Sequence, residues 1–282
     1  MGERPFKLWL YLLIVFGLSW PFQFISVLGP TTIAWAVIFN SLSMIMVGVG
    51  TFICGRYVFR DGFAGAGWRW GAGRYYAFAL GFPALLWIVP ALIDLSTGGL
   101  KLPRTITTTQ IAWVLEMLFV VLIPAFGEEI GWRGYMLPRM GLGKSARRTV
   151  MLHGVIWYAW HLPIVARGAV AQIRGEIEGP GLILAVAAGL VLAMVPVVLD
   201  AAIFAWLWAR SASIAVVTVF HAASDGFRDS LSITVGCGPV GDVASIGLTM
   251  LLGVLLLWKA DWHGLLAHVS RPADSTDQNS AP

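Results

Sequence analysis

The sequence predicts an all-α membrane protein, a bundle of about eight transmembrane helices. Of its 282 residues, 58% are hydrophobic and only 12% are charged, and one water-soluble core could not bury that much apolar surface. The apolar residues gather in long runs, and roughly 20 apolar residues are enough to cross the hydrocarbon of a bilayer. Composition therefore excludes an ordinary soluble domain.

Eight runs are candidate spans. In chain order they are residues 6–28, 32–54, 75–93, 111–126, 150–165, 182–208, 214–224 and 243–258. The fourth, fifth, seventh and eighth runs are short for a full span, so we expect them to include polar residues at their ends or to be partly re-entrant. The first run is followed by no small-residue cleavage site, and we interpret it as a retained anchor.

The chain is predicted to form one domain. Residues 1–269 make a single transmembrane helical domain, and residues 111–225 within it hold the motifs described below. Residues 270–282 are rich in Pro, Asp, Ser, Gln and Asn and are predicted to be a disordered polar tail. Cys54 and Cys237 fall on opposite sides of the predicted topology, so a disulfide between them is excluded.

The basic residues predict the orientation. When both termini and the connections 55–74, 127–149 and 209–213 are placed on one side, only five of the 19 Lys and Arg residues fall on the other. These five are Lys101, Arg104, Arg167, Arg174 and Arg228. The positive-inside rule then makes both termini cytoplasmic, in the plasma (inner) membrane. No basic run is dense enough to predict nucleic-acid binding.

Two adjacent carboxylates, Glu128 and Glu129, stand at the end of the fourth apolar run and are followed by Arg133. If the helix continues to about Met136, Glu129 and Arg133 lie four residues apart on one face and can pair. Glu128 is rotated by roughly 100° and is left free to act as a general base. Pro124 is expected to bend the helix and direct the carboxylates into the bundle. A structural ion pair is the alternative explanation for Glu129 and Arg133.

One histidine lies deep in the fifth run. His161 follows Trp157 by four residues and lies roughly 18 Å along the helix from Thr149, well within the membrane. A lone histidine among aromatic residues is usually a core residue bonded to a carbonyl group. We give that interpretation to His153, which lies eight residues earlier.

The seventh run carries a second histidine motif, in which His221 and Asp225 are four residues apart on one helical face. An aspartate beside an imidazole fixes its tautomer and orientation. The alternative is a buried pair that only ties helices together. Two further acids stay unassigned: interface exposure would explain Asp94, and a salt bridge with Arg210 would explain Asp200.

The three motifs are expected to meet, because charged groups in separate apolar runs are buried most cheaply against one another. In this order they resemble the signatures E-E-x-x-x-R, F-x-x-x-H and H-x-x-x-N/D of the CAAX-protease and bacteriocin-processing (CPBP, Abi) family of intramembrane endopeptidases. Two positions depart from the usual pattern. Trp157 replaces Phe and is expected only to reshape the pocket. Asp225 stands where the prenyl-protein proteases have Asn, and an ionised Asp cannot donate a hydrogen bond to an oxyanion.

The resemblance implies an intramembrane endopeptidase that hydrolyses a peptide bond of a membrane-associated or lipidated protein or peptide, in a cavity open towards the cytoplasm. Its expected partners are that substrate and the lipid bilayer. The implied catalytic set is Glu128, Glu129, Arg133, His161, His221 and Asp225.

The resemblance also implies roles for these residues. Glu128, helped by His161, activates the attacking water, while Glu129 and Arg133 shape the site and balance its charge. His221 donates to the oxyanion or orients another group, with Asp225 as its partner.

Three alternatives remain open from the sequence. Glu128, His161 and His221 could instead bind a catalytic zinc ion, which is the alternative to the metal-free glutamate mechanism that we favour. A non-catalytic membrane scaffold or immunity-type protein could keep the same fold. A transporter with an intramembrane proton relay is least favoured, because the polar residues cluster and no internal repeat is detected.

Overall fold

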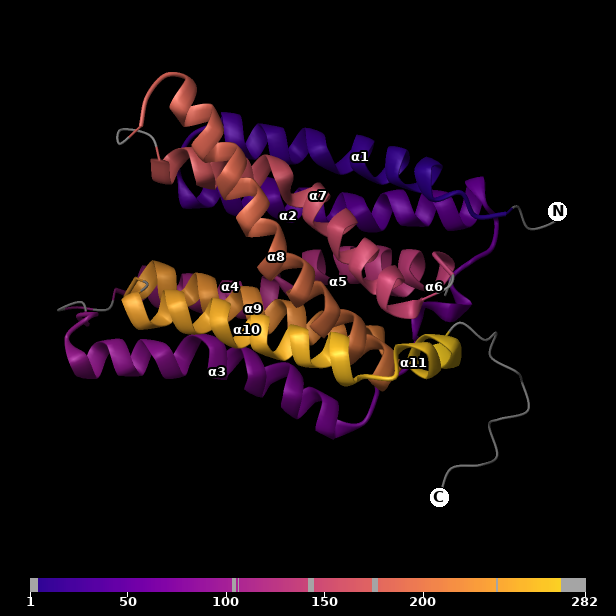
Figure 1. Cartoon of the computed structure of the whole chain (residues 1–282). Coiled ribbons are helices and arrows are strands. Elements are labelled where there is room, and N and C mark those ends of the chain that lie inside the picture. Colours follow the sequence, from indigo (N-terminus) through magenta and orange to yellow (C-terminus); the bar gives the residue numbers. More distant parts are fainter. Residues whose placement is uncertain are drawn as a thin grey trace.

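The computed structural model describes residues 5–102, 105, 107–141, 145–173, 177–236 and 238–269 and contains no β-strand in these ranges. The helices form a bundle in which α11 lies at the same end as the start of α1 (Figure 1). The α-helices are α1 (Leu8–Leu28), α2 (Ile33–Ile53), α3 (Gly73–Thr97), α4 (Thr108–Val120), α5 (Leu122–Gly131), α6 (Leu137–Arg139), α7 (Ala146–Ile173), α8 (Pro180–Ser211), α9 (Ile214–Thr234), α10 (Pro239–Lys259) and α11 (Trp262–Val269). The predicted tail, residues 270–282, and Cys237 lie outside the described residues.

Six helices of the described chain are long and apolar enough to cross a membrane, which confirms an all-α polytopic membrane protein. They are α1, α2 with its π-helical extension η1 (Cys54–Val58), α3, α7, α8 and α10. The fifth predicted run reaches 28 residues as α7 by including polar residues at its ends. The seventh run becomes α9, which carries Asp225, Arg228 and Asp229 and is less apolar than a typical span.

The fourth predicted run is broken into two helices at Val121. Pro124 explains the break, because it has no N–H to give to the carbonyl group of Val120 and its ring crowds that carbonyl. Beyond the break, α5 continues directly into the π-helical turn η3 (Trp132–Met136) and then α6. The helix therefore reaches Met136, and the interruption between α4 and α5 is the single residue Val121, whose backbone stays in the helical region (φ −62°, ψ −20°).

α5 lies against α2 with almost no space between the two backbones. A Cβ atom on Gly127 would lie 2.8 Å from the carbonyl oxygen of Met44 and 2.9 Å from Cα of Ile45, and a Cβ on Gly48 would lie 3.0 Å from Cα of Gly127. Glycine is the one residue type that permits this approach. The contact fixes the depth and rotation of α5, and with it the position of the two glutamates that follow Gly127.

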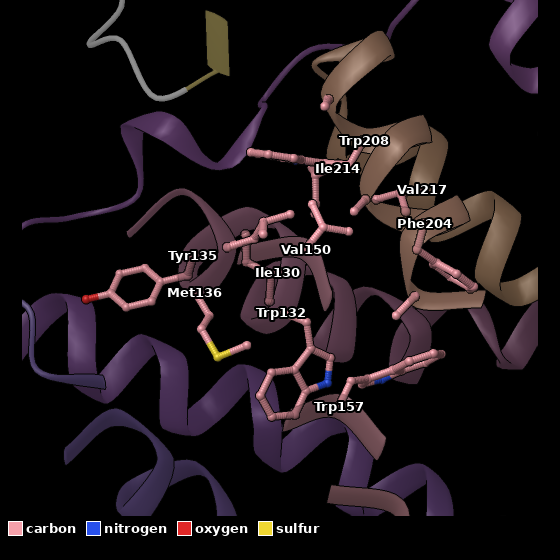
Figure 2. Packing of buried hydrophobic residues seen from close by; sticks show 14 of the residues in the cluster. Ile130, Trp132, Tyr135, Met136, Val150, Trp157, Phe204, Trp208, Ile214 and Val217 are labelled. Carbon is pink, nitrogen blue, oxygen red and sulfur yellow. The ribbon is translucent and has the colours of Figure 1, made fainter. Parts of the chain in front are cut away.

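Large aromatic side chains fill the buried core around the end of α5. Figure 2 shows Trp132, Tyr135, Trp157, Phe204 and Trp208 packed with aliphatic residues of the same core. The hydroxyl group of Tyr11 donates to the carbonyl group of Gly131 over 3.0 Å, which ties α1 to the end of α5. This core forms a rigid support beneath the polar residues of α5.

Asp94 has a structural function that corrects the expectation of interface exposure. Its side chain is fully buried, and its two carboxylate oxygens accept hydrogen bonds from the backbone N–H groups of Val240 (3.1 Å) and Gly241 (2.8 Å). A carboxylate at this position satisfies the free N–H groups of the first turn of α10 and interacts favourably with the helix dipole. Asp94 therefore joins α3 to α10.

Candidate active site

The side chains of the three motifs come together between α5, α7 and α9, with Trp157 at their centre. The indole Nε1–H of Trp157 donates to Oε2 of Glu128 over 3.0 Å. The Trp157 ring centroid lies 5.0 Å from that of His161 and 6.5 Å from that of His221. Glu128, His161 and His221 all line one cavity. The structure thus brings together the three residues that the sequence assigned to different helices.

Glu129 lies at the centre of a buried ionic network. Arg133 donates to its Oε1 over 2.8 Å, as the spacing of four residues predicted, and both side chains have no exposed surface. The same Oε1 accepts from Nδ1 of His221 over 2.7 Å. The guanidinium carbon of Arg133 lies 4.4 Å from the ring centroids of both Trp157 and Phe204, so two aromatic faces enclose the cation. Burial of such charges requires this pairing.

Asp225 lies between a histidine and an arginine. Its Oδ2 is 3.4 Å from Nε2 of His221, and its Oδ1 is 3.0 Å from Nη1 of Arg228. Arg228 also donates from Nε to Asp229 over 2.8 Å. The guanidinium of Arg228 balances the charge of Asp225, which favours an ionised carboxylate that accepts hydrogen bonds and leaves donation to His221.

The hydrogen bond made by His161 determines which of its nitrogens is available. Nδ1 lies 2.9 Å from the backbone carbonyl oxygen of Trp157, one turn earlier on α7. Because a carbonyl oxygen can only accept, Nδ1 must carry the hydrogen, and in the neutral ring the lone pair is then on Nε2. His161 can therefore accept a proton or a hydrogen bond from a molecule in the cavity.

The cavity has a volume of about 680 Å³ and extends away from the end of the bundle that carries the start of α1. From Glu128 and Phe204 it reaches Ile33 in the first turn of α2 and Ser232 near the end of α9. Its walls are largely apolar along α2 and α3, where they include Val37 and Leu86, and polar along α9. The lining residues therefore extend away from the end that carries the start of α1, whereas the termini and the opening of the cavity were both predicted to face the cytoplasm.

Two further polar residues named in the sequence lie in different surroundings, Asp200 at the cavity and His153 in the core. Asp200 lines it, and the described residues include no ion pair between Asp200 and Arg210, which lie ten residues apart, about 15 Å along α8. His153 is fully buried, with Nε2 3.2 Å from the carbonyl oxygen of Trp132, as expected for a core histidine.

Three contributors were missed by sequence reasoning. Trp157 donates to Glu128, Phe204 stacks on Arg133, and Arg228 pairs with Asp225. Trp157 was expected only to reshape the pocket, and that expectation was incomplete. Its departure from the usual Phe was the one signal in the sequence that could have suggested a new hydrogen bond.

The predicted zinc ligands do not fit a metal site in this arrangement. Among the residues that the structure describes, no group of three or more His, Cys, Asp and Glu side chains is placed to hold a metal ion. Nδ1 of His221 is bonded to Glu129 and its Nε2 faces Asp225, so neither nitrogen offers a free lone pair towards Glu128 and His161.

Comparison with known proteins agrees with the resemblance carried by the three motifs. Residues 110–227 match the model of the family described as Type II CAAX prenyl endopeptidase Rce1-like. The protein named CAAX prenyl protease 2 from Methanococcus maripaludis is 35% identical over 51 residues. That stretch covers 18% of this chain and 19% of the relative, so the similarity to the relative is confined to a short segment. These matches confirm the predicted resemblance over residues 110–227.

Proposed function

We propose, from the membership of residues 110–227 in the Rce1-like CAAX prenyl endopeptidase family, that this integral membrane protein is an intramembrane endopeptidase. Its proposed substrate is a lipidated or otherwise membrane-associated protein, cleaved within or near the bilayer. The apolar walls of the cavity along α2 and α3 would accommodate a lipid chain or an apolar peptide beside the polar groups of α9.

The observation that carries this proposal is that Glu128 and His161 border the same cavity and are joined through Trp157. In the proposed reaction a water molecule between them loses its proton to the Glu128 carboxylate as its oxygen attacks the scissile carbonyl carbon. Nε2 of His161 orients the water by accepting its second hydrogen. The proton held by Glu128 then passes to the leaving nitrogen, which restores the carboxylate.

His221 is the proposed donor to the oxyanion. Its Nδ1 is held by Glu129, and its Nε2 makes the longer, 3.4 Å contact with Asp225, so Nε2–H is the group available to donate to the developing negative charge. Asp225 and Glu129 hold the ring in position. Arg133 pairs with Glu129 and balances its charge in this dry environment.

The first prediction is that the purified chain, reconstituted in liposomes, cleaves a lipidated peptide that carries a fluorescent reporter beyond the scissile bond. Because the proposed mechanism uses no metal, cleavage is expected to continue after treatment with a chelator. Stoichiometric zinc in the active protein, lost together with activity on chelation, would reverse the choice of mechanism. Failure to cleave a panel of lipidated peptides would favour the scaffold or immunity-type alternative.

The second prediction concerns access to the cavity. We propose that both termini are cytoplasmic and that the cavity therefore opens towards the opposite face of the membrane. In a Cys54→Ala/Cys237→Ser background, a protein with Asp229→Cys, a cavity-lining position in the last two turns of α9, is expected to react with a membrane-impermeant maleimide on intact cells. An Arg56→Cys protein, exposed near the end of α2, should react only after the membrane is opened. The reverse pattern would mean that the orientation is inverted.

A further inference from the structure

We propose that Trp157 is a positioning residue, whose indole N–H holds the Glu128 carboxylate in the orientation needed to accept a proton from water. This inference rests on the proposed function, since it concerns the same catalytic carboxylate. It assigns Trp157 a contribution that the phenylalanine usual at this position in the resembled motif cannot make, because a phenyl ring has no hydrogen-bond donor. The supporting contact is the 3.0 Å bond from Nε1 to Oε2 of Glu128.

The Trp157 ring is itself held firmly. It is 5% exposed, and the guanidinium carbon of Arg133 lies 4.4 Å from its ring centroid. The centroid of Phe204 lies 5.4 Å away at an interplanar angle of 52°. A ring enclosed in this way loses little additional freedom when it donates a hydrogen bond. The direction of Nε1–H is thus set by the packing of α7 against α5 and α8.

The bond selects between the two oxygens of Glu128. Oε2 is used by Trp157, which leaves Oε1 as the oxygen with greater freedom to accept from a water molecule in the cavity. The side chain is only 1% exposed, and it has few alternatives to this donor in so dry a position. Without the bond, the carboxylate could rotate away from the water that it must deprotonate, so the effect of Trp157 is expected on the chemical step.

The network also links Glu128 to the neighbouring ion pairs. The guanidinium of Arg133 lies over the Trp157 ring. Arg133 pairs with Glu129, and Glu129 in turn bonds to His221. Trp157 therefore contacts both the Glu128 carboxylate and the cation that pairs with Glu129. The adjacent glutamates obtain different partners although they are neighbours in the sequence.

The test is the variant Trp157→Phe, which keeps an aromatic ring and removes the donor. A hydrogen bond to a charged group is worth about 10- to 100-fold in rate when it orients a reacting group. We expect kcat to fall by about that factor with KM within about twofold of the wild type. The matched control is Trp208→Phe, which removes an indole bond of 3.3 Å to the carbonyl of Ala66 in the core, away from the cavity, and should leave kcat unchanged.

A second measurement keeps the inference testable even if the chain cleaves nothing. In a double-mutant cycle on the midpoint of unfolding, Trp157→Phe should lower the midpoint less in a Glu128→Ala background than in the wild type, because the partner is already absent. Equal shifts in both backgrounds, or a Trp157→Phe enzyme with unchanged kcat or with a change in KM alone, would overturn the positioning assignment. Absence of cleavage by the wild type would instead count against the proposed function.

Discussion

Replacing Glu128 by Gln is expected to reduce kcat for peptide cleavage by about 10²- to 10⁴-fold, the usual contribution of a general base. The amide keeps the size of the side chain and can still accept from Trp157 through its oxygen, so the fold should be retained. It cannot take a proton from water. The measurement is the rate of cleavage of a lipidated peptide by purified protein, compared at equal amounts of folded chain.

The matched control is Glu178→Gln, the same chemical change at an exposed glutamate just before α8, which should leave the rate unchanged. Retention of full activity by the Glu128→Gln protein would remove Glu128 from the reaction. Retention of a biological effect by a Glu128→Gln protein that no longer cleaves would show that the function is binding, as the scaffold alternative requires.

Contacts within one helix could be predicted from the sequence because helix geometry dictates them. Glu129 and Arg133, like His221 and Asp225, are four residues apart, and that spacing alone places each pair on one face. The apolar runs likewise predicted the helices, since backbone groups in lipid have to be satisfied within a helix. The cost of burying isolated charges in lipid then predicted that these polar faces would meet.

Contacts between helices could not be predicted in the same way. The bond between Glu129 and His221 joins residues 92 positions apart, and no local rule determines which of the two glutamates faces α9. The close contact of α2 and α5 at Gly127 sets that rotation, together with the break that Pro124 imposes. The cap that Asp94 provides for α10 depends on tertiary packing in the same sense.

The direction in which the cavity extends through the bundle could not be predicted from the sequence. The distribution of Lys and Arg predicts which face of the membrane each end of the bundle meets. The position of the cavity depends instead on which end of the bundle is filled by large side chains. Here Trp132, Tyr135 and Trp208 fill the end near the start of α1, and the polar side of α9 continues to the other end. Bulky aromatic residues in the sequence did not reveal on which helical faces they would lie.

Replacing Arg133 by Met is expected to produce the largest loss of stability, about 3–5 kcal/mol in the free energy of unfolding, because it leaves a buried carboxylate without its main partner. Arg133 and Glu129 are both fully buried, and Met would also lose the attraction of the cation to the rings of Trp157 and Phe204. The measurement is unfolding in mixed detergent micelles, followed by circular dichroism or by loss of tryptophan signal.

The double variant Glu129→Gln/Arg133→Met shows how much of the stability loss comes from burying an unpaired charge and how much comes from lost packing. It removes both charges and should recover part of the stability lost by Arg133→Met, since no unpaired carboxylate then remains beside His221. The comparison variant is Arg228→Met, at an arginine whose side chain is 46% exposed. Its loss in the free energy of unfolding should stay within about 1 kcal/mol. A double variant less stable than Arg133→Met alone would mean that Glu129 is stabilised chiefly by His221 and that Arg133 contributes mainly through packing against the two rings.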